Sequence, residues 1–148
     1  MRAFEFVNNR LTIIQQIIEC ERGPWTILES TSNVEIWYSS LYLDSIRDKP
    51  QSVVDRLELF IQTKKENPTA SFSNRDAPFN SKGPYGRLIP KLRHAHLNLD
   101  VSVVYKVEGS KPTILKIFGL WTHDELGTAG NPRVEKQMAT KIKNADTH

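Results

Sequence analysis

The alternation of hydrophobic and polar positions along the chain predicts two amphipathic helices. Apolar residues recur at the spacing of one buried helix face from Val53 to Ile61, and Pro50 and Pro68 bound this run. A second helix is expected from Asn131 onwards, because an Asn side chain accepts an unpaired backbone N–H at a helix start. The residues that would line its buried face are Val134, Met138 and Ile142.

Alternating segments rich in aromatic and β-branched residues predict four strands. They are expected at residues 34–43, 91–98, 101–107 and 113–122. Residues 67–90 hold four of the eight prolines, so a long surface loop is expected there. Together these patterns predict an α+β domain with a small, four-stranded, mainly antiparallel sheet, with its helices on one side.

Residues 1–32 are expected to form an N-terminal extension of a domain that spans residues 33–148. Gly23-Pro24 breaks the extension near its end. A short helix packed on the domain is one possible structure for it. The residues at helical spacing there are Leu11, Ile14, Ile17 and Ile18.

Composition narrows the compartment and the class of partner. The chain has 148 residues, of which 39% are hydrophobic and 25% charged, and this suits one folded domain. The single cysteine, Cys20, excludes an intramolecular disulfide framework and a multi-cysteine zinc site. Neither a secretory signal nor an apolar run of about 18 residues is present, so we expect a cytoplasmic protein without a membrane partner. The net charge of +3 suits an anionic partner without requiring one.

Two histidines on one predicted strand are the first candidates for chemistry. His94 and His96 are two positions apart, so they share a face of the strand with about 6.5 Å between their Cα atoms. His123 ends the last predicted strand. In an antiparallel meander, His96 and His123 would converge on one surface, joined by Asp100 from a turn and Tyr105 from the middle strand.

Such a group of residues suits metal-independent cleavage of RNA. This reaction needs a base for the 2′-hydroxyl proton, an acid for the leaving 5′-oxygen, and cations beside the phosphate. Imidazole serves both proton-transfer roles, because its unperturbed pKa near 6.5 lies close to the operating pH. Arg93 would face away from the histidines unless a bulge brings it round. The candidate cations are Arg87, Lys91, Arg93 and Lys106.

Two other interpretations of the histidines stay open. Histidines on a half-exposed sheet are commonly ordinary surface residues. Alternatively, His94, His96 and His123 would supply three nitrogen ligands to a catalytic zinc ion. The sequence has no phosphate-cradling glycine loop, nucleophile elbow or dinucleotide fingerprint.

Five segments, taken in order, resemble one known superfamily of proteins. They are residues 61–68, residues 74–77, residues 93–107, residues 122–127 and the closing helix from Asn131 to Met138. Over residues 34–143 their order and content resemble the RelE/ParE superfamily of bacterial toxin–antitoxin toxins. Within it, the likeness is greatest to the YafO-like and YafQ-like mRNA interferases. The resemblance implies a RelE-like fold similar to that of microbial ribonucleases, with a small antiparallel sheet flanked by helices.

The resemblance also assigns residues. His96 and Asp100 match a His and an Asp of the YafQ-like active site with the same three residues between them, and His123 matches the His that follows the last strand. Two features depart from the YafQ-like pattern. The loop Gly83–Pro90 lacks an upstream active-site histidine, for which Arg87 or His94 would substitute. Gly127 stands where the YafQ-like toxins have an aromatic residue, a few positions after the last histidine.

The function implied by this resemblance is that of a type II toxin, a ribosome-dependent mRNA endoribonuclease without a cofactor or a metal. His96 and His123 would transfer protons, Asp100 would orient an imidazole, Arg93 or Arg87 would neutralise the phosphate, and Tyr105 would support the site. The expected RNA-binding residues are Arg87, Lys91, His94 and Lys106. The expected partners are mRNA, the ribosome and a cognate antitoxin. The alternatives are a non-catalytic or gyrase-directed module of the same fold, and a metal-dependent hydrolase.

Overall fold

The computed structural model of the protein describes residues 25–31 and 33–146. The helical pattern at residues 11–18 lies outside these described residues.

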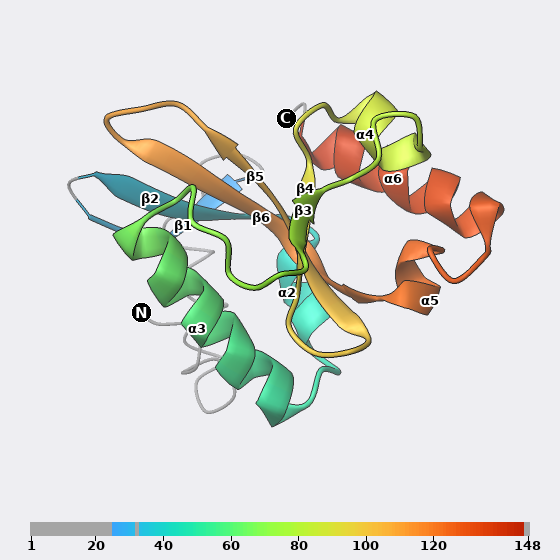
Figure 1. Cartoon of the computed structure of the whole chain (residues 1–148), viewed down its shortest axis with the longest axis horizontal. Coiled ribbons are helices and arrows are strands. Elements are labelled where there is room, and N and C mark those ends of the chain that lie inside the picture. Colours follow the sequence, from blue (N-terminus) through green and yellow to red (C-terminus); the bar gives the residue numbers. More distant parts are fainter. Residues whose placement is uncertain (1–24, 32, 147–148) are drawn as a thin grey trace.

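Six strands form one sheet in the order β1-β2-β6-β5-β4-β3 (Figure 1). Neighbouring strands are antiparallel except for β2 and β6, which run parallel. The sheet therefore contains the predicted meander in β4, β5 and β6, together with two edge strands that the sequence patterns did not predict. The strands are β1 (Trp25–Ser30), β2 (Val34–Ser39), β3 (Asp76–Pro78), β4 (Arg93–His96), β5 (Val101–Glu108) and β6 (Thr113–Thr122).

Strand β1 corrects the predicted domain boundary at residue 33. Trp25–Ser30 was assigned to the extension, but it pairs with β2, and its residues Trp25 and Leu28 are buried. The pairing register shifts between Ile27 and Glu29, and this irregularity interrupts the alternation of hydrophobic and polar positions. The folded domain therefore begins no later than Trp25.

Five helices are present in the part of the chain that the structure describes. Helix α3 starts directly after Pro50 and ends before Asn67, as the apolar spacing predicted. The strand predicted over residues 34–43 ends earlier, at Ser39, and a short helix follows it. None of these helices has the length and apolar character needed to cross a lipid bilayer. The helices are α2 (Tyr42–Ile46), α3 (Gln51–Glu66), α4 (Pro84–Leu88), α5 (His123–Leu126) and α6 (Pro132–Asp146).

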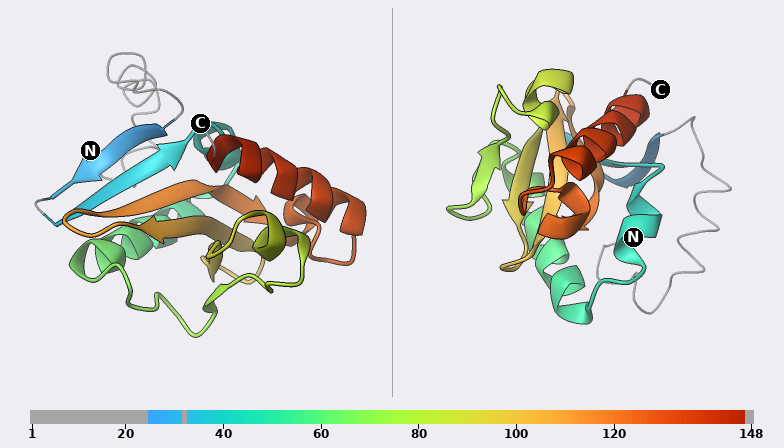
Figure 2. Two further views of the ribbon diagram at one scale, coloured as in Figure 1. Left: turned by 90° about the horizontal axis from the view of Figure 1, so that it is seen from above. Right: turned by 90° about the vertical axis from the view of Figure 1, so that its right-hand side faces the viewer.

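The sheet buries both of its faces, so the prediction of helices on one side only is wrong. On one face, Phe60 of α3 packs in a cluster with Val103 of β5. On the other face, Ile142 of α6 packs in a cluster with Val104 and Phe118. Figures 1 and 2 show the positions of α3 and α6 beside the sheet. The reason lies in β6, where residues 115–121 form a continuous buried run, as expected for a strand that is covered on both sides.

Candidate active site

Strand β4 places two histidines on the face of the sheet that carries α6. His94 lies opposite Val104 and His96 opposite Ser102 in the antiparallel pairing with β5. Because side chains alternate along a strand, both imidazoles project to the same side. The ring centroids of His94 and His96 are 5.9 Å apart, and those of His96 and His123 are 5.3 Å apart. Three imidazoles from two separate segments therefore lie close together, with His96 next to each of the other two.

The three histidines line a pocket of about 280 Å³. Phe79 and Ser102 line it as well, together with residues of α5 and of the loop that follows α5. The ring of Phe79 lies 4.5 Å from that of His94, measured between centroids. We call this space the histidine pocket. It is concave and carries titratable groups, which are the two features that ligand-binding sites in proteins commonly combine.

His123 is held in place by the way α5 begins. The side chain of Thr122 accepts a hydrogen bond from the backbone N–H of Glu125, and the Glu125 carboxylate accepts one from the backbone N–H of Thr122. This reciprocal capping box fixes the first turn of α5. The same Oε1 atom of Glu125 lies 3.1 Å from Nζ of Lys49, whose side chain is almost fully buried. Gly127 ends α5 with a φ of +78°, a conformation that favours glycine.

Asp100 approaches His123 from the turn between β4 and β5. Its Oδ1 atom accepts a hydrogen bond of 3.2 Å from the backbone N–H of His123 and lies 3.5 Å from Nδ1 of the ring. The predicted proximity of His96, Asp100 and His123 is thus present in the structure. A carboxylate in this position can fix the orientation of the imidazole.

Burial sets the electrostatics of the two strand histidines. It lowers the pKa of His94, and the nearby His96 lowers it further. Burial is also the chief cause of the lowered pKa of His96, with contributions from the charges of His123 and Arg75. Both rings are therefore mainly neutral near pH 7, the form in which an imidazole accepts a proton.

The structure does not bring Arg93 and Tyr105 to the histidines. Arg93 lies opposite Tyr105 in the β4–β5 pairing and projects to the α3 face, since the pairing is regular from Arg93 to His96. Its Nε donates to the Tyr105 hydroxyl at 3.0 Å, and that hydroxyl donates to Asp76. Asp76 also pairs with Lys64, at 2.8 Å. We call Lys64, Asp76, Arg93 and Tyr105 the Asp76 cluster; the predicted convergence of Tyr105 with the histidines is wrong.

The other predicted cations also lie away from the histidine pocket. Lys106 forms ion pairs with Glu108 at 3.1 Å and with Asp146 at 3.2 Å. Arg87 and Lys91 are exposed in and after α4, and neither lines the histidine pocket. Within the described part of the chain, a cation that neutralises a phosphate beside the histidines must therefore be another residue.

Arg75 is a candidate for this role that the sequence patterns did not predict. Arg75 and His96 line a second pocket, of about 390 Å³. Arg75 precedes β3, and β3 pairs with β4 such that Asp76 lies opposite Ala95. The motif containing Arg75 was noted for its resemblance to the toxins, but its place in the fold depends on a three-residue strand that contains Pro78. Such a strand is too short to be predicted from periodicity.

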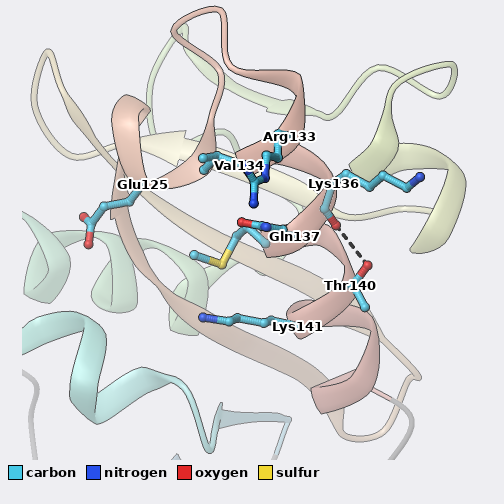
Figure 3. Close-up of a pocket in the computed structure, with 8 residues that line it drawn as sticks. Glu125, Arg133, Val134, Lys136, Gln137, Thr140 and Lys141 are labelled. Carbon is cyan, nitrogen blue, oxygen red and sulfur yellow. Dashed lines mark hydrogen bonds between the residues drawn. The ribbon is translucent and has the colours of Figure 1, made fainter.

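A larger pocket, of about 670 Å³, is lined by residues of α5 and α6 (Figure 3). Its lining includes the exposed cations Arg133, Lys136 and Lys141 but no histidine. Figure 3 shows Glu125 across from the side chains of α6, and the Thr140 hydroxyl donates to the backbone oxygen of Lys136. The histidine pocket is smaller, yet it holds the paired acid–base groups, so chemistry rather than volume identifies the candidate site.

The alternative of a three-histidine metal site is not supported by the arrangement of the side chains. Across residues 25–31 and 33–146, no group of three or more His, Cys, Asp or Glu side chains is placed to hold a metal ion.

No protein-family model matches the chain, and no curated protein matches it either. Among solved structures, the chain is similar to a YoeB/ParE toxin from Agrobacterium tumefaciens, with 15% identity and a TM-score of 0.48; the match covers 60% of this chain and 96% of that one. It is also similar to the E. coli DinJ-YafQ complex, with 21% identity and a TM-score of 0.45; this match covers 65% and 98%. Identities of this size concern the fold alone.

Proposed function

We propose that the protein is the toxin of a type II toxin–antitoxin system and that it cleaves mRNA by acid–base catalysis without a metal. The observation that carries this proposal is the approach of His96 and His123, whose ring centroids lie 5.3 Å apart at an open pocket. Two imidazoles at this separation can contact opposite sides of one phosphodiester. Positioning of this kind supplies a large part of the rate enhancement of an enzyme.

The two histidines have different surroundings, which assigns them different roles. His96 is kept neutral by burial and by neighbouring positive charge, so it takes the proton of the 2′-hydroxyl. The 2′-oxygen then bonds to phosphorus, and the bond from phosphorus to the 5′-oxygen breaks. His123, whose Nδ1 lies 3.5 Å from Oδ1 of Asp100, donates a proton to that 5′-oxygen. The products are a 2′,3′-cyclic phosphate and a 5′-hydroxyl end.

The remaining roles follow from exposure and charge. His94 lines the histidine pocket beside Phe79 and contacts the bound RNA. Arg87 and Lys91 are exposed and available to RNA phosphates. The net charge of only +3 is small for tight binding to free RNA, so we propose that the ribosome presents the mRNA. A cognate antitoxin would neutralise the toxin in the cytoplasm.

Controlled expression of the full chain tests this proposal. We expect the wild-type protein to arrest growth and to generate new 5′ ends within coding sequences. His96→Ala and His123→Ala should each reduce cleavage by about 10² to 10⁴-fold, the usual contribution of a proton-transfer group. Asp124→Ala is the matched control, because Asp124 is exposed in the same short helix as His123 and has no role in the proposed mechanism. Transcript 5′ ends would be mapped for all four proteins, with circular dichroism used to confirm folding.

Each contrary result points to a different function. A folded His123→Ala variant that still cleaves would remove His123 from the mechanism. Intact transcripts combined with a DNA-damage response would indicate a gyrase-directed toxin. Loss of activity of the purified wild-type protein upon chelation would indicate a metal-dependent hydrolase.

A further inference from the structure

His96 stands between two pockets rather than at the edge of one. On one side lies the histidine pocket, and on the other lies the pocket of about 390 Å³ that contains Arg75. We call the second space the Arg75 pocket; its lining includes Arg56, Asn74, Arg75, Asn98 and Leu99. A phosphodiester held between His96 and His123 joins two nucleotides. Two adjoining pockets that share His96 match this requirement.

Arg75 carries a positive charge that no other described residue neutralises. Its side chain forms no ion pair within residues 25–31 and 33–146, and the residue is exposed. Its backbone N–H donates to the Ser73 hydroxyl at 3.2 Å, which fixes the turn that presents the side chain. The charge of Arg75 contributes to lowering the pKa of His96, so the two side chains are electrostatically close. A phosphate next to the cleaved bond would find its cation here.

The rest of the Arg75 pocket has groups that suit a nucleobase. Oδ1 of Asn98 accepts hydrogen bonds from the backbone N–H groups of Asp100 and Val101, which orients the side-chain amide. Leu99, at the tip of the same turn, is 86% exposed. Arg56 is fixed at the rim, with Nε donating to the Leu97 carbonyl at 3.3 Å and the guanidinium 4.7 Å from the Phe72 ring. Single-stranded RNA bases are bound by hydrogen bonds to their edges and by stacking on guanidinium planes, and an exposed Leu99 adds apolar contact.

We propose that the Arg75 pocket is a nucleotide subsite, in which Arg75 binds a phosphate of single-stranded RNA next to the cleaved bond and Leu99 contacts the adjoining base. This inference rests on the proposed function and names a substrate contact that the proposed mechanism lacks. It also explains why the mechanism can dispense with Arg93, whose guanidinium is bonded to Asp76 and Tyr105.

The experiment measures RNA binding apart from cleavage. The full chain carrying His123→Ala is titrated into a fluorescein-labelled single-stranded RNA of about ten nucleotides that contains all four bases, at several salt concentrations. Adding Arg75→Ala should weaken binding several-fold for every sequence tested. It should also reduce the slope of log K against log salt by about 0.7, the value for one phosphate contact to a single strand. Leu99→Ala should change the discrimination between bases and leave the salt slope as it was.

Arg133→Ala on α6 is the matched control, because it removes the same charge from an exposed site elsewhere. An Arg75→Ala protein that binds RNA with unchanged affinity and salt slope would overturn the inference. An equal loss for Arg133→Ala would also overturn it, because the effect would then reflect net charge alone. If RNA binding requires Arg75 but the wild-type protein does not cleave RNA, the subsite stands and the proposed function fails. If the wild-type protein cleaves and Arg75→Ala changes nothing, only the subsite fails.

Discussion

Strand β4 contributes to a polar group of side chains on each face of the sheet, the Asp76 cluster on the α3 face and the histidine pocket on the α6 face. The two groups differ in how completely their polar atoms are paired. On the α3 face, the side chains of Lys64 and Asp76 are 1% and 0% exposed and bond to each other. On the α6 face, the side chains of His123 and Asp100 are 37% and 62% exposed. Arg93 and His94 are neighbours on β4, yet Arg93 belongs to a closed network and His94 to an open site.

The difference shows how burial decides whether a polar side chain is available for chemistry. A buried charge is tolerated only when it is paired and hydrogen-bonded, so the Asp76 cluster uses its donors and acceptors internally. Arg93 is an example, because its guanidinium donates hydrogen bonds to Asp76 and Tyr105 on the face opposite the histidines and is not available to a substrate there. The histidine pocket keeps titratable nitrogens at a surface where a substrate can supply the missing contacts.

The largest expected effect separates the two faces by stability. Asp76→Ala leaves Lys64 as an uncompensated buried charge, so the free energy of unfolding should fall by about 3 to 5 kcal/mol. His96→Gln, on the open face, should change it by less than about 1 kcal/mol. Denaturant unfolding of both variants measures the contrast. Similar losses for the two variants would show that the histidine face is as structural as the Asp76 cluster.

An effect of intermediate size concerns the carboxylate beside His123. Asp100→Asn keeps an oxygen that can accept the His123 N–H but removes the negative charge near Nδ1. We expect the cleavage rate to fall about 100-fold through poorer positioning of the ring, with little change in stability. Single-turnover cleavage by purified protein on programmed ribosomes would measure this. An unchanged rate would limit Asp100 to shaping the turn.

The smallest effect is a difference between the two faces in the dependence of stability on pH. The pKa values of His94 and His96 are lowered in the folded state, chiefly by burial, so the unfolded chain binds more protons as the pH falls through about 6.5. Stability should therefore decrease there, by much less than the loss for Asp76→Ala. Burial tends to raise the pKa of Asp76, but hydrogen bonds from Lys64 and Tyr105 lower it overall. Its contribution is present above pH 3.8 and is lost only at lower pH, as the folded-state pKa is crossed.

Urea unfolding over a series of pH values tests these two windows. A variant with Asn at positions 94 and 96 should lose the dependence near pH 6.5 and keep the acid transition. Retention of the full dependence near pH 6.5 in that variant would assign it to other groups.

The sequence predicted those parts of the fold that depend on local patterns. The bounds of β6 agree with the predicted 113–122, and α3 lies between the two signals that were expected to bound it. Strand β1 was missed because its bulge interrupts the alternation, and β3 because three residues are too few to show a period. The covering of both sheet faces depends on the partners of β6, which local patterns do not specify.

The same distinction holds for the candidate site. The shared face of His94 and His96 follows from alternation within a single strand, and Asp100 and His123 lie at the ends of adjacent strands. The position of Tyr105 could not be read in this way, because its neighbours Asp76 and Lys64 come from distant segments. Arg75 likewise reaches His96 only through the pairing of β3 with β4. Contacts between remote segments need the three-dimensional arrangement.

The carboxylate of Glu125 joins two parts of the domain that are distant in sequence. One of its oxygens accepts bonds both from the N–H of Thr122 and from Lys49, which lies 76 positions earlier in the chain. A shift of the segment between α2 and α3 would thus be transmitted through one shared atom to the turn that carries the proposed proton donor. The position of the proposed proton donor therefore depends on a lysine that does not line the histidine pocket.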